Sequence, residues 1–350
     1  MFEFSFRLTL KYLLLKVPGF FHLAAFLTRH SPRVFMYHRF VNLPDRYHER
    51  IDSASFAWQL SVLAKGWNVI TLSEYVRMIH AGNHPPAYSV ILTVDDGYRD
   101  FYDIGYPLLM RDRLTATIFP SIAFLDGDWL WWDQLHFILT RTTRRHCALT
   151  LGDKHYEFDL RDDTTRHQAW STLNMICTHQ GAETRSKIVS DLAQQLEVTL
   201  PASPTNGYAP FSWNDLGSMK AQGIEVGAHT LTHPILSQES PQRVWEEVSS
   251  SKKRLEEEIG DTVGTFCYPN GKKQDIGPFV RNRVEMAGYT AAVTSLTSMP
   301  GPVDPYMIPR MGVGCSRADF LWKLCGNETL VESIKKYLFD YFQRSSTKRS

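Results

Sequence analysis

Short apolar runs alternate with amphipathic segments along most of the chain. Residues 90–94 read V-I-L-T-V without a charge, a pattern typical of a strand buried on both faces of a parallel sheet. Segments such as 55–63 and 240–259 instead repeat their apolar residues at helical spacing. Further strands are predicted at 34–40, 67–72, 116–120, 224–226, around 268, at 291–293 and at 307–310. This alternation predicts an α/β fold, and 350 residues are enough for a (β/α) barrel with an insertion.

The alternation of strands and helices is interrupted in the middle of the chain. Two stretches of alternating apolar residues, 147–151 and 156–160, flank a Gly-Asp turn and predict a β-hairpin, which two amphipathic helices follow. We therefore predict an inserted α+β subdomain at 127–209, in a barrel formed by 31–126 and 210–326. The tryptophans that begin the insertion either contact a sugar ring or an acyl chain, or pack the insertion against the barrel.

The two ends of the chain differ from this pattern. Residues 1–30 interleave Arg and Lys with Phe and Leu, against a single acid, Glu3. Their longest charge-free run is too short to span a bilayer, and no well-formed secretory cleavage site follows it. This amphipathic segment is predicted either to lie in a membrane interface or to pack as a helix on the outside of the barrel. Residues 327–350 are predicted to form a terminal amphipathic helix and a tail.

Composition narrows the choice of partners and compartment. Lys and Arg total 38 against 37 for Asp and Glu, so the charge gives no reason to expect nucleic acid as a partner. The five cysteines are scattered and form no C-x-x-C pair, a distribution that favours a reducing compartment. Together with the basic, aromatic N-terminus, this predicts a cytoplasmic protein attached peripherally to the inner face of the cell membrane.

Two groups of candidate metal ligands follow predicted strands. Asp95 and Asp96 end an uncharged buried strand, where a bound cation would compensate their charges. His229 and His233 follow another strand, and histidines four residues apart can face the same way if they lie on a helical turn. One carboxylate and two imidazoles leave coordination positions for water and substrate, and the second carboxylate is free to act as a base. The alternative is that Asp96-Gly97 is only a turn and Asp95 caps the next helix.

Three motifs resemble those of the polysaccharide deacetylases, the NodB-homology family of carbohydrate esterases. Residues 93–97 read T-V-D-D-G, similar to the family's T-F-D-D-G, and residues 229–234 read H-T-L-T-H-P, similar to H-[ST]-x-x-H-P. Residues 266–271 read F-C-Y-P-N-G, similar to the family's R-x-P-Y-G or Y-P-x-G segment. The motifs occur in the family's order, and the resemblance covers roughly 34–134 and 210–320. It implies a distorted (β/α) barrel of the NodB-homology type.

The resemblance also implies roles for individual residues. It assigns one divalent metal to Asp96, His229 and His233, with zinc as the expected ion and other divalent ions left open. It gives the role of base to Asp95. It places the backbone N–H of Tyr268 at the oxyanion, a contribution of about 3 kcal/mol in comparable sites.

Two features of the family pattern are missing. The arginine that orients the base has no counterpart beside residues 266–271, and Arg310 is the candidate to supply its charge from another strand. The C-terminal L-x-H motif that gives the general acid is also absent, since no histidine follows His233. His38, at the end of the first predicted strand, is the candidate acid because barrel strands end on a common face. His136, in the insertion, is the weaker rival.

With the resemblance, these residues predict a metal-dependent hydrolase that removes N-acetyl groups from an amino sugar. The expected substrate is a polysaccharide, an oligosaccharide or a lipid-linked sugar intermediate. A deformylase or another amidohydrolase of the same fold remains an alternative, as does a catalytically inactive carbohydrate-binding relative. The paired carboxylates and histidines argue against an inactive protein, whereas the missing C-terminal histidine argues for it.

Overall fold

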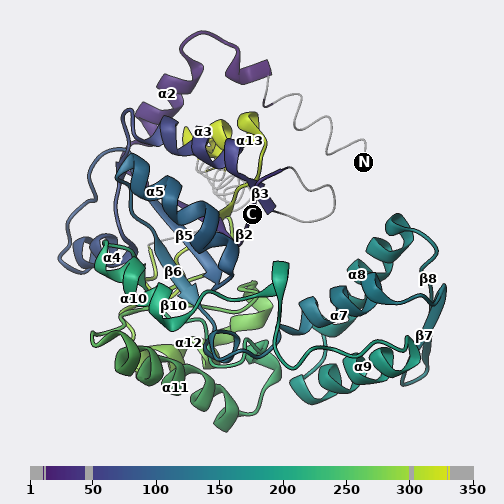
Figure 1. The fold of residues 1–350 in the computed structure, drawn as a ribbon. Helices are drawn as coiled ribbons and strands as arrows, with labels where there is room; N and C mark the ends of the chain where they lie inside the picture. Colours follow the sequence, from purple (N-terminus) through teal and green to yellow (C-terminus); the bar gives the residue numbers. More distant parts are fainter. Residues whose placement is uncertain (1–10, 12, 44–49, 299–302, 329, 332–350) are drawn as a thin grey trace, which may run out of the picture.

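The computed structural model of the chain describes residues 11, 13–43, 50–298, 303–328 and 330–331. Its centre is a parallel sheet with the strand order β12-β1-β5-β6-β9, and β4 pairs with the start of β5 (Figure 1). Separate pairings join β10 to β11 and β2 to β3. The strands are β1 (Arg33–Tyr37), β2 (Arg39–Val41), β3 (Arg50–Asp52), β4 (Asn68–Val69), β5 (Ser89–Asp96), β6 (Thr117–Pro120), β9 (Glu225–Val226), β10 (Thr265–Cys267), β11 (Ala291–Val293) and β12 (Met311–Gly312).

Single parallel bridges connect these pairings into a circuit. Ala228, just after β9, bridges Phe266 in β10, and Val293 in β11 bridges Ile308, shortly before β12. Pairing therefore passes from β1 through β5, β6, β9, β10 and β11 to β12, which returns to β1. This arrangement is that of a distorted (β/α) barrel, and the predicted fold class is confirmed.

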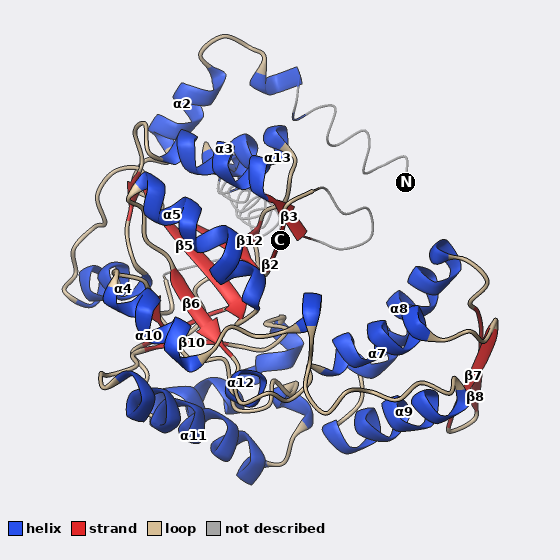
Figure 2. Cartoon of the chain, in the orientation of Figure 1, coloured by secondary structure: helices blue, strands red, loops and turns tan. Residues whose placement is uncertain are grey.

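Helices surround the strands, as the amphipathic pattern predicts (Figure 2). Thr71 and Glu74 form a reciprocal capping box at the start of α4, and Ser212 and Asp215 form another at α10. Gly260, with φ 62°, ends α11 in a left-handed conformation. The barrel helices are α3 (Ser53–Leu63), α4 (Leu72–His80), α5 (Tyr106–Asp112) after a π-helical turn (Phe101–Gly105), α6 (Ile122–Leu125), α10 (Trp213–Ala221), α11 (Pro241–Ile259), α12 (Lys273–Met286) and α13 (Arg317–Leu324).

Every residue of β5 is buried, as predicted for a strand that begins as an uncharged run. Its neighbours β1 and β6 pair with it on either side, and apolar residues of the barrel pack around it in one large cluster. Gly227 permits a close approach nearby, since a Cβ at this position would lie 2.3 Å from the ring of Phe119. Gly227 therefore lets the end of β9 approach β6 closely, at the edge where ligands bind in α/β sheets.

Residues 131–200 form a lobe that extends to one side of the barrel (Figure 1). The predicted hairpin is present, and Leu151 pairs with Lys154 across a turn in which Gly152 has φ 58°. The lobe has its own cluster of buried apolar side chains, which includes Leu135 and Leu173. Its elements are α7 (Trp131–Arg141), β7 (His146–Leu151), β8 (Lys154–Asp159), α8 (Asp163–Thr178) and α9 (Ala182–Gln195).

The tryptophans at the start of this lobe have different surroundings. Trp129 packs against Phe137 and Tyr208, with 5.4 Å between the ring centroids in each case. The Arg185 guanidinium lies over the ring of Trp131 at 5.4 Å. These contacts favour the packing interpretation for Trp129 and Trp131, whereas the following tryptophan reaches the candidate site described below.

Two predicted strands are shorter or shifted in the structure. The strand predicted at 67–72 is reduced to β4, because Thr71 already caps α4. The strand predicted at 307–310 is found later, as β12, and only Ile308 of that range forms a bridge. Pro309 has no N–H to donate, and the N–H of Arg310 donates to the Leu296 carbonyl instead, so regular pairing begins only at residue 311.

The N-terminal helix α2 (Phe20–Leu27) packs on the outside of the barrel. Ala24 and Ala25 are buried with Cys325, and Phe20 stacks on Trp322 of α13. Residues 1–10 and 12 of the predicted amphipathic segment lie outside the described residues, as do 329 and 332–350 of the predicted terminal helix and tail. Within the described part of the chain, no helix has the length and apolar character needed to cross a bilayer.

Candidate active site

Asp95 and Asp96 are the last residues of β5, and both side chains point into buried space. Asp95 is 2% exposed and Asp96 is 4% exposed. Asp96 has φ 73°, a left-handed conformation that non-glycine residues adopt rarely and at an energetic cost. The chain then turns sharply at Gly97, where a Cβ would lie 3.1 Å from Pro120. Surrounding packing therefore holds this strained strand end in place.

His229 and His233 come from the loop after β9, and they converge without a helical turn. The loop is irregular, with Thr230 at φ 66° and His233 at φ 55°. The Thr230 hydroxyl donates to the His229 carbonyl over 2.5 Å and accepts from the N–H of His233 over 3.0 Å. A helical turn is therefore not needed for the two histidines to face each other, because the strained loop brings their Nε2 atoms to 3.0 Å from each other.

Asp96, His229 and His233 direct three ligand atoms toward one another. Asp96 Oδ1 lies 3.5 Å from Nε2 of each histidine, and the two Nε2 atoms are 3.0 Å apart. Ligands at about 2.0–2.1 Å from a tetrahedral zinc ion are separated by about 3.3 Å. The three spacings therefore suit a divalent ion of that size, and three protein ligands leave a coordination position free.

Hydrogen bonds around the imidazoles favour the same ligand atoms. His229 Nδ1 lies 2.8 Å from the Cys267 carbonyl and donates to it, which leaves Nε2 unprotonated in the neutral ring. His233 Nδ1 is buried, and no hydrogen-bond partner for it lies among the described residues. Both Nε2 atoms therefore remain available on the side of Asp96.

The charges of this group are balanced best by a cation. Burial tends to raise the pKa of Asp96, but its hydrogen bond and charge interactions with histidines lower it overall. Burial tends to lower the pKa of His229, but Cys267, Asp96 and Asp95 raise it well above its usual value. Burial and the positive charge on His229 lower the pKa of His233 to about 3. The pocket thus favours positive charge between ionised carboxylates, which a divalent ion would supply.

Arg310 holds Asp95 in a bidentate salt bridge. The two terminal nitrogens of the guanidinium each donate to a different oxygen of Asp95 over 2.7 Å, and one also donates to the Thr93 hydroxyl over 2.9 Å. Burial opposes ionisation of Asp95, but the charge and hydrogen bonds of Arg310 outweigh it and hold the pKa of the carboxyl well below its usual range. This geometry is what the predicted orienting role of Arg310 requires.

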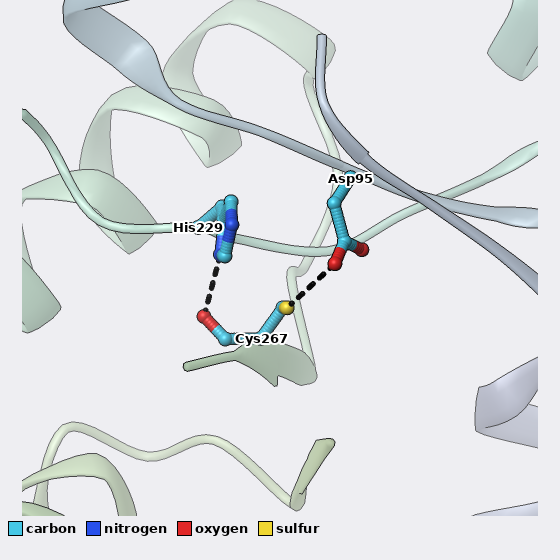
Figure 3. A group of neighbouring side chains, drawn as sticks. All are labelled: Asp95, His229 and Cys267. Atoms are coloured by element: carbon cyan, nitrogen blue, oxygen red, sulfur yellow. Dashed lines mark hydrogen bonds between the residues drawn. The ribbon is translucent and has the colours of Figure 1, made fainter. Parts of the chain in front are cut away.

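Cys267 forms a second cluster with Asp95 and His229 (Figure 3). Its Sγ lies 3.5 Å from Asp95 Oδ2, while its backbone carbonyl accepts the hydrogen bond of His229. This group suits a metal less well than the first, because Asp95 already pairs with Arg310 and burial raises the pKa of the Cys267 thiol. Cys267 packs against the candidate base, and its backbone carbonyl accepts a hydrogen bond from His229, a candidate metal ligand.

The remaining sequence candidates lie at different distances from this centre. His38 follows β1, its side chain is 42% exposed, and its Nε2 lies 3.6 Å from Asp95 Oδ2. The rival His136 lies in the lobe, where its Nδ1 is 2.6 Å from the Tyr208 hydroxyl. The N–H of Tyr268 donates to the Val293 carbonyl over 3.3 Å, so an oxyanion role would require it to leave this long hydrogen bond.

Comparison with known proteins agrees with this geometry. A sequence model described as "Polysaccharide deacetylase" matches residues 166–292, which include both histidines and the third motif. Over these residues the chain is similar to the polysaccharide deacetylases. This similarity indicates a hydrolase that acts on carbon–nitrogen bonds other than peptide bonds. The match begins within α8 of the lobe and does not include Asp95, Asp96 or Arg310, whose assignment rests on the motif and the geometry.

Solved structures of deacetylases share the fold of this chain. The Streptococcus pyogenes deacetylase PplD, solved with acetate, has a TM-score of 0.56 and 16% identity, over 84% of this chain and 97% of that one. IcaB from Ammonifex degensii has a TM-score of 0.52 and 18% identity, over 84% and 95% of the two chains. A Bacillus cereus polysaccharide deacetylase has a TM-score of 0.51 and 14% identity, over 84% and 68%. Among curated proteins, no sequence matches this chain significantly.

The candidate site also includes residues that the sequence did not single out. The ring of Trp132, from the lobe, contacts His233 with 4.6 Å between centroids, and its Nε1 donates to the Tyr98 hydroxyl over 2.9 Å. That hydroxyl donates in turn to Asp133 Oδ2 over 2.7 Å. The sequence shows the tryptophan-rich segment, but it does not show that Trp132 contacts His233, a candidate metal ligand. Glu247 of α11, which binds the histidine loop, gave no sequence signal.

Proposed function

We propose that this deacetylase removes N-acetyl groups from an amino sugar, and that it depends on one divalent metal held by Asp96, His229 and His233. The observation that carries the proposal is the convergence of these three ligand atoms beside a separate, arginine-bound carboxylate, Asp95. Zinc is the expected ion, because one oxygen and two imidazole nitrogens form a donor set of the kind that catalytic zinc sites use.

Amide hydrolysis needs an activated water, a base, stabilisation of the oxyanion and an acid for the leaving amine. When bound, the metal would polarise the acetyl carbonyl and acidify the attacking water. Asp95 is ionised and oriented by Arg310, so it accepts the proton of that water. The low pKa keeps Asp95 ionised at neutral pH, as a group that accepts a proton must be.

We assign the proton for the leaving amine to His38. Its Nε2 lies on the same side of the barrel as Asp95, 3.6 Å from Oδ2, and the imidazole remains partly exposed to an incoming substrate. The family's usual C-terminal histidine is absent from this sequence. His136 is less suitable because it is held by Tyr208 in the lobe.

A direct assay tests the proposed reaction. Purified protein loaded with zinc is incubated with N-acetylated oligosaccharides, polysaccharides and lipid-linked amino sugars, and both acetate and free amine are measured. We expect both products in equal amounts with at least one substrate class, and neither with Asp95→Asn. Release of formate from an N-formyl substrate, or opening of a cyclic amide, would instead indicate one of the alternative amidohydrolases. Binding of a sugar without any turnover would indicate an inactive carbohydrate-binding relative.

We further propose that the protein works at the cytoplasmic face of the cell membrane, where a lipid-linked substrate would be accessible. Helix α2 is docked through Ala24 and Ala25, whereas Leu23, Phe26 and Leu27 are 60%, 52% and 61% exposed. The sequence carries no acidic residue between positions 4 and 44, while six basic residues fall in that range. A fixed apolar face within a basic segment fits an anionic lipid surface.

Flotation with lipid vesicles tests this location. The intact protein should float with vesicles that contain phosphatidylglycerol and remain unbound with phosphatidylcholine alone. The variant in which Leu23, Phe26 and Leu27 are all replaced by Ser should lose this binding. Met286→Ser, which removes a 65% exposed apolar side chain on α12, is the matched control and should still float. Equal flotation of the triple variant, or cleavage of the N-terminus after export in cells, would contradict the proposal.

A further inference from the structure

A buried carboxylate on α11 binds the loop that carries the two histidines. Glu247 has 0% exposure although its helix lies on the outside of the barrel. Its Oε2 accepts the N–H groups of Leu231 and Thr232 over 2.8 and 2.9 Å. Its Oε1 accepts the Thr232 hydroxyl over 2.5 Å. The proposed chemistry does not use this carboxylate, so its contacts need another explanation.

The opposite side of the same loop is bound by the start of α6. The N–H of Ile122 donates to the Thr230 carbonyl over 3.3 Å, and that of Ala123 donates to the Leu231 carbonyl over 2.7 Å. The Ser121 hydroxyl also donates to the Leu231 carbonyl, over 3.2 Å. The short segment between the two histidines is therefore held by acceptors on one side and donors on the other.

This loop needs external support because its backbone is strained. Thr230 and His233 both adopt left-handed conformations, with φ 66° and 55°, and such residues persist only where their surroundings enforce them. Arg243 compensates the buried charge, since one of its terminal nitrogens lies 2.6 Å from Glu247 Oε1. A loop released from Glu247 would be free to relax, and His233 would move away from His229.

We propose that Glu247 is a positioning residue that holds His229 and His233 at their metal-binding separation. The inference rests on the proposed metal role of the two histidines. Glu247 contacts neither the metal ligands' rings nor the reacting atoms, so its removal should weaken metal binding and leave the ligand set unchanged. Loss of such an outer partner typically lowers metal affinity by about 10- to 100-fold.

Metal binding by two variants tests this role without an activity assay. Glu247→Gln keeps the size of the side chain but loses the charge and one acceptor oxygen. Thr232→Val keeps the loop N–H groups and removes only the hydroxyl donor, so it serves if the first variant folds poorly. Zinc affinity is measured by competition with a chromogenic chelator, and the visible spectrum of the cobalt-substituted protein reports ligand geometry. We expect about 10- to 100-fold weaker zinc binding and an altered spectrum for Glu247→Gln, with smaller changes of the same kind for Thr232→Val.

Glu256→Gln is the matched control on the same helix. Glu256 accepts the N–H of Val263 over 3.0 Å and pairs with Lys252 at 3.0 Å, away from the histidine loop. We expect this variant to lower thermal stability while zinc affinity and the cobalt spectrum stay those of the wild type. The proposal is overturned if both loop variants bind zinc as the wild type does, or if the control loses as much affinity. A wild-type protein without divalent metal affinity would overturn the proposed function instead.

Discussion

Arg310 donates to both oxygens of Asp95 over 2.7 Å, although the two residues are 215 positions apart in the sequence. A planar guanidinium that meets a carboxylate in this way fixes the direction of the carboxylate as well as its charge. The family pattern places an orienting arginine beside the third motif, where this chain has residues 266–271 without one. The structure supplies the charge from the segment before β12 instead.

Replacing Arg310 should move the pH dependence of deacetylation. Asp95 acts as a base only when ionised, and Arg310 keeps its pKa low, so the acidic limb of the activity profile lies at low pH in the wild type. In Arg310→Met, burial is no longer outweighed, the pKa of Asp95 rises, and the acidic limb of kcat/KM should shift to higher pH. Arg310→Lys, which keeps the charge, should shift it less. If the acidic limb of kcat/KM is unchanged in both variants, Arg310 does not set the pKa of the base.

The two aspartates should differ in what they contribute. His229→Ala and Asp96→Asn should lose bound metal and activity together, because each removes a ligand atom. Asp95→Asn should retain metal while turnover falls by roughly 10²-fold or more, the usual contribution of a positioned base. Metal content is measured by elemental analysis after zinc loading and gel filtration. A metal-free Asp95→Asn beside a loaded Asp96→Asn would reverse the two assignments.

His38 should be needed for the chemical step but not for metal binding. His38→Phe removes the proposed proton donor beside Asp95, so kcat should fall by roughly 10²–10⁴-fold while metal content and the unfolding temperature stay near those of the wild type. His136→Phe serves as the control and should keep most of the activity. Near-normal turnover of His38→Phe, or a larger loss in His136→Phe, would contradict the assignment.

Asp133 should make stability depend on pH. Burial raises the pKa of this carboxyl to about 7, although Arg39 and the Tyr98 hydroxyl partly oppose the shift. Between about pH 4 and pH 7 the folded protein therefore binds a proton that the unfolded chain has lost, so stability decreases as pH rises through this window. From pH 5 to pH 8 the loss from this group is about 3 kcal/mol.

Asp133→Asn should remove that part of the pH dependence, because the amide does not ionise. Urea unfolding of the metal-free protein gives the free energy of unfolding at pH 5 and at pH 8. This free energy should differ less between the two pH values in the variant than in the wild type. Because only the change in unfolding free energy between the two pH values is compared, any destabilisation by the substitution that does not depend on pH cancels. Equal pH dependence in both proteins would show that Asp133 is ionised over the whole range.

Local motifs were sufficient to predict much of the candidate site. Asp95 and Asp96 end an uncharged strand, and the two histidines follow another, so pattern and chemistry together identified them. Arg310 was predicted because the orienting arginine of the family pattern is missing beside residues 266–271. The backbone conformation around these residues could not be predicted in the same way. The histidine loop is strained at Thr230 and His233 rather than helical, because contacts with α6 and α11 override local preference.

Residues that act through tertiary contacts have no local sequence pattern that identifies them. Glu247 sits in a helix rich in charged residues, and its local pattern is that of an ordinary solvent-facing glutamate. Its partners are 15 and 16 positions earlier, and only the packing of α11 against the barrel brings them together. Trp132 likewise meets His233 only because the lobe folds back on the barrel. Neither contact follows from spacing along the chain.

The long separation of Asp95 from Arg310 has a consequence for biosynthesis. During translation, β5 leaves the ribosome with its two carboxylates well before the arginine that neutralises one of them is made, since 215 residues separate the pair. A buried carboxylate without its partner is costly, so the barrel centre should stay loosely packed until nearly the whole chain is available. Long-range pairing of this kind also slows folding. Nascent chains that end before residue 310 should therefore expose the β5 region to chaperones and proteases, so the proposed base would be completed only when the chain itself is nearly complete.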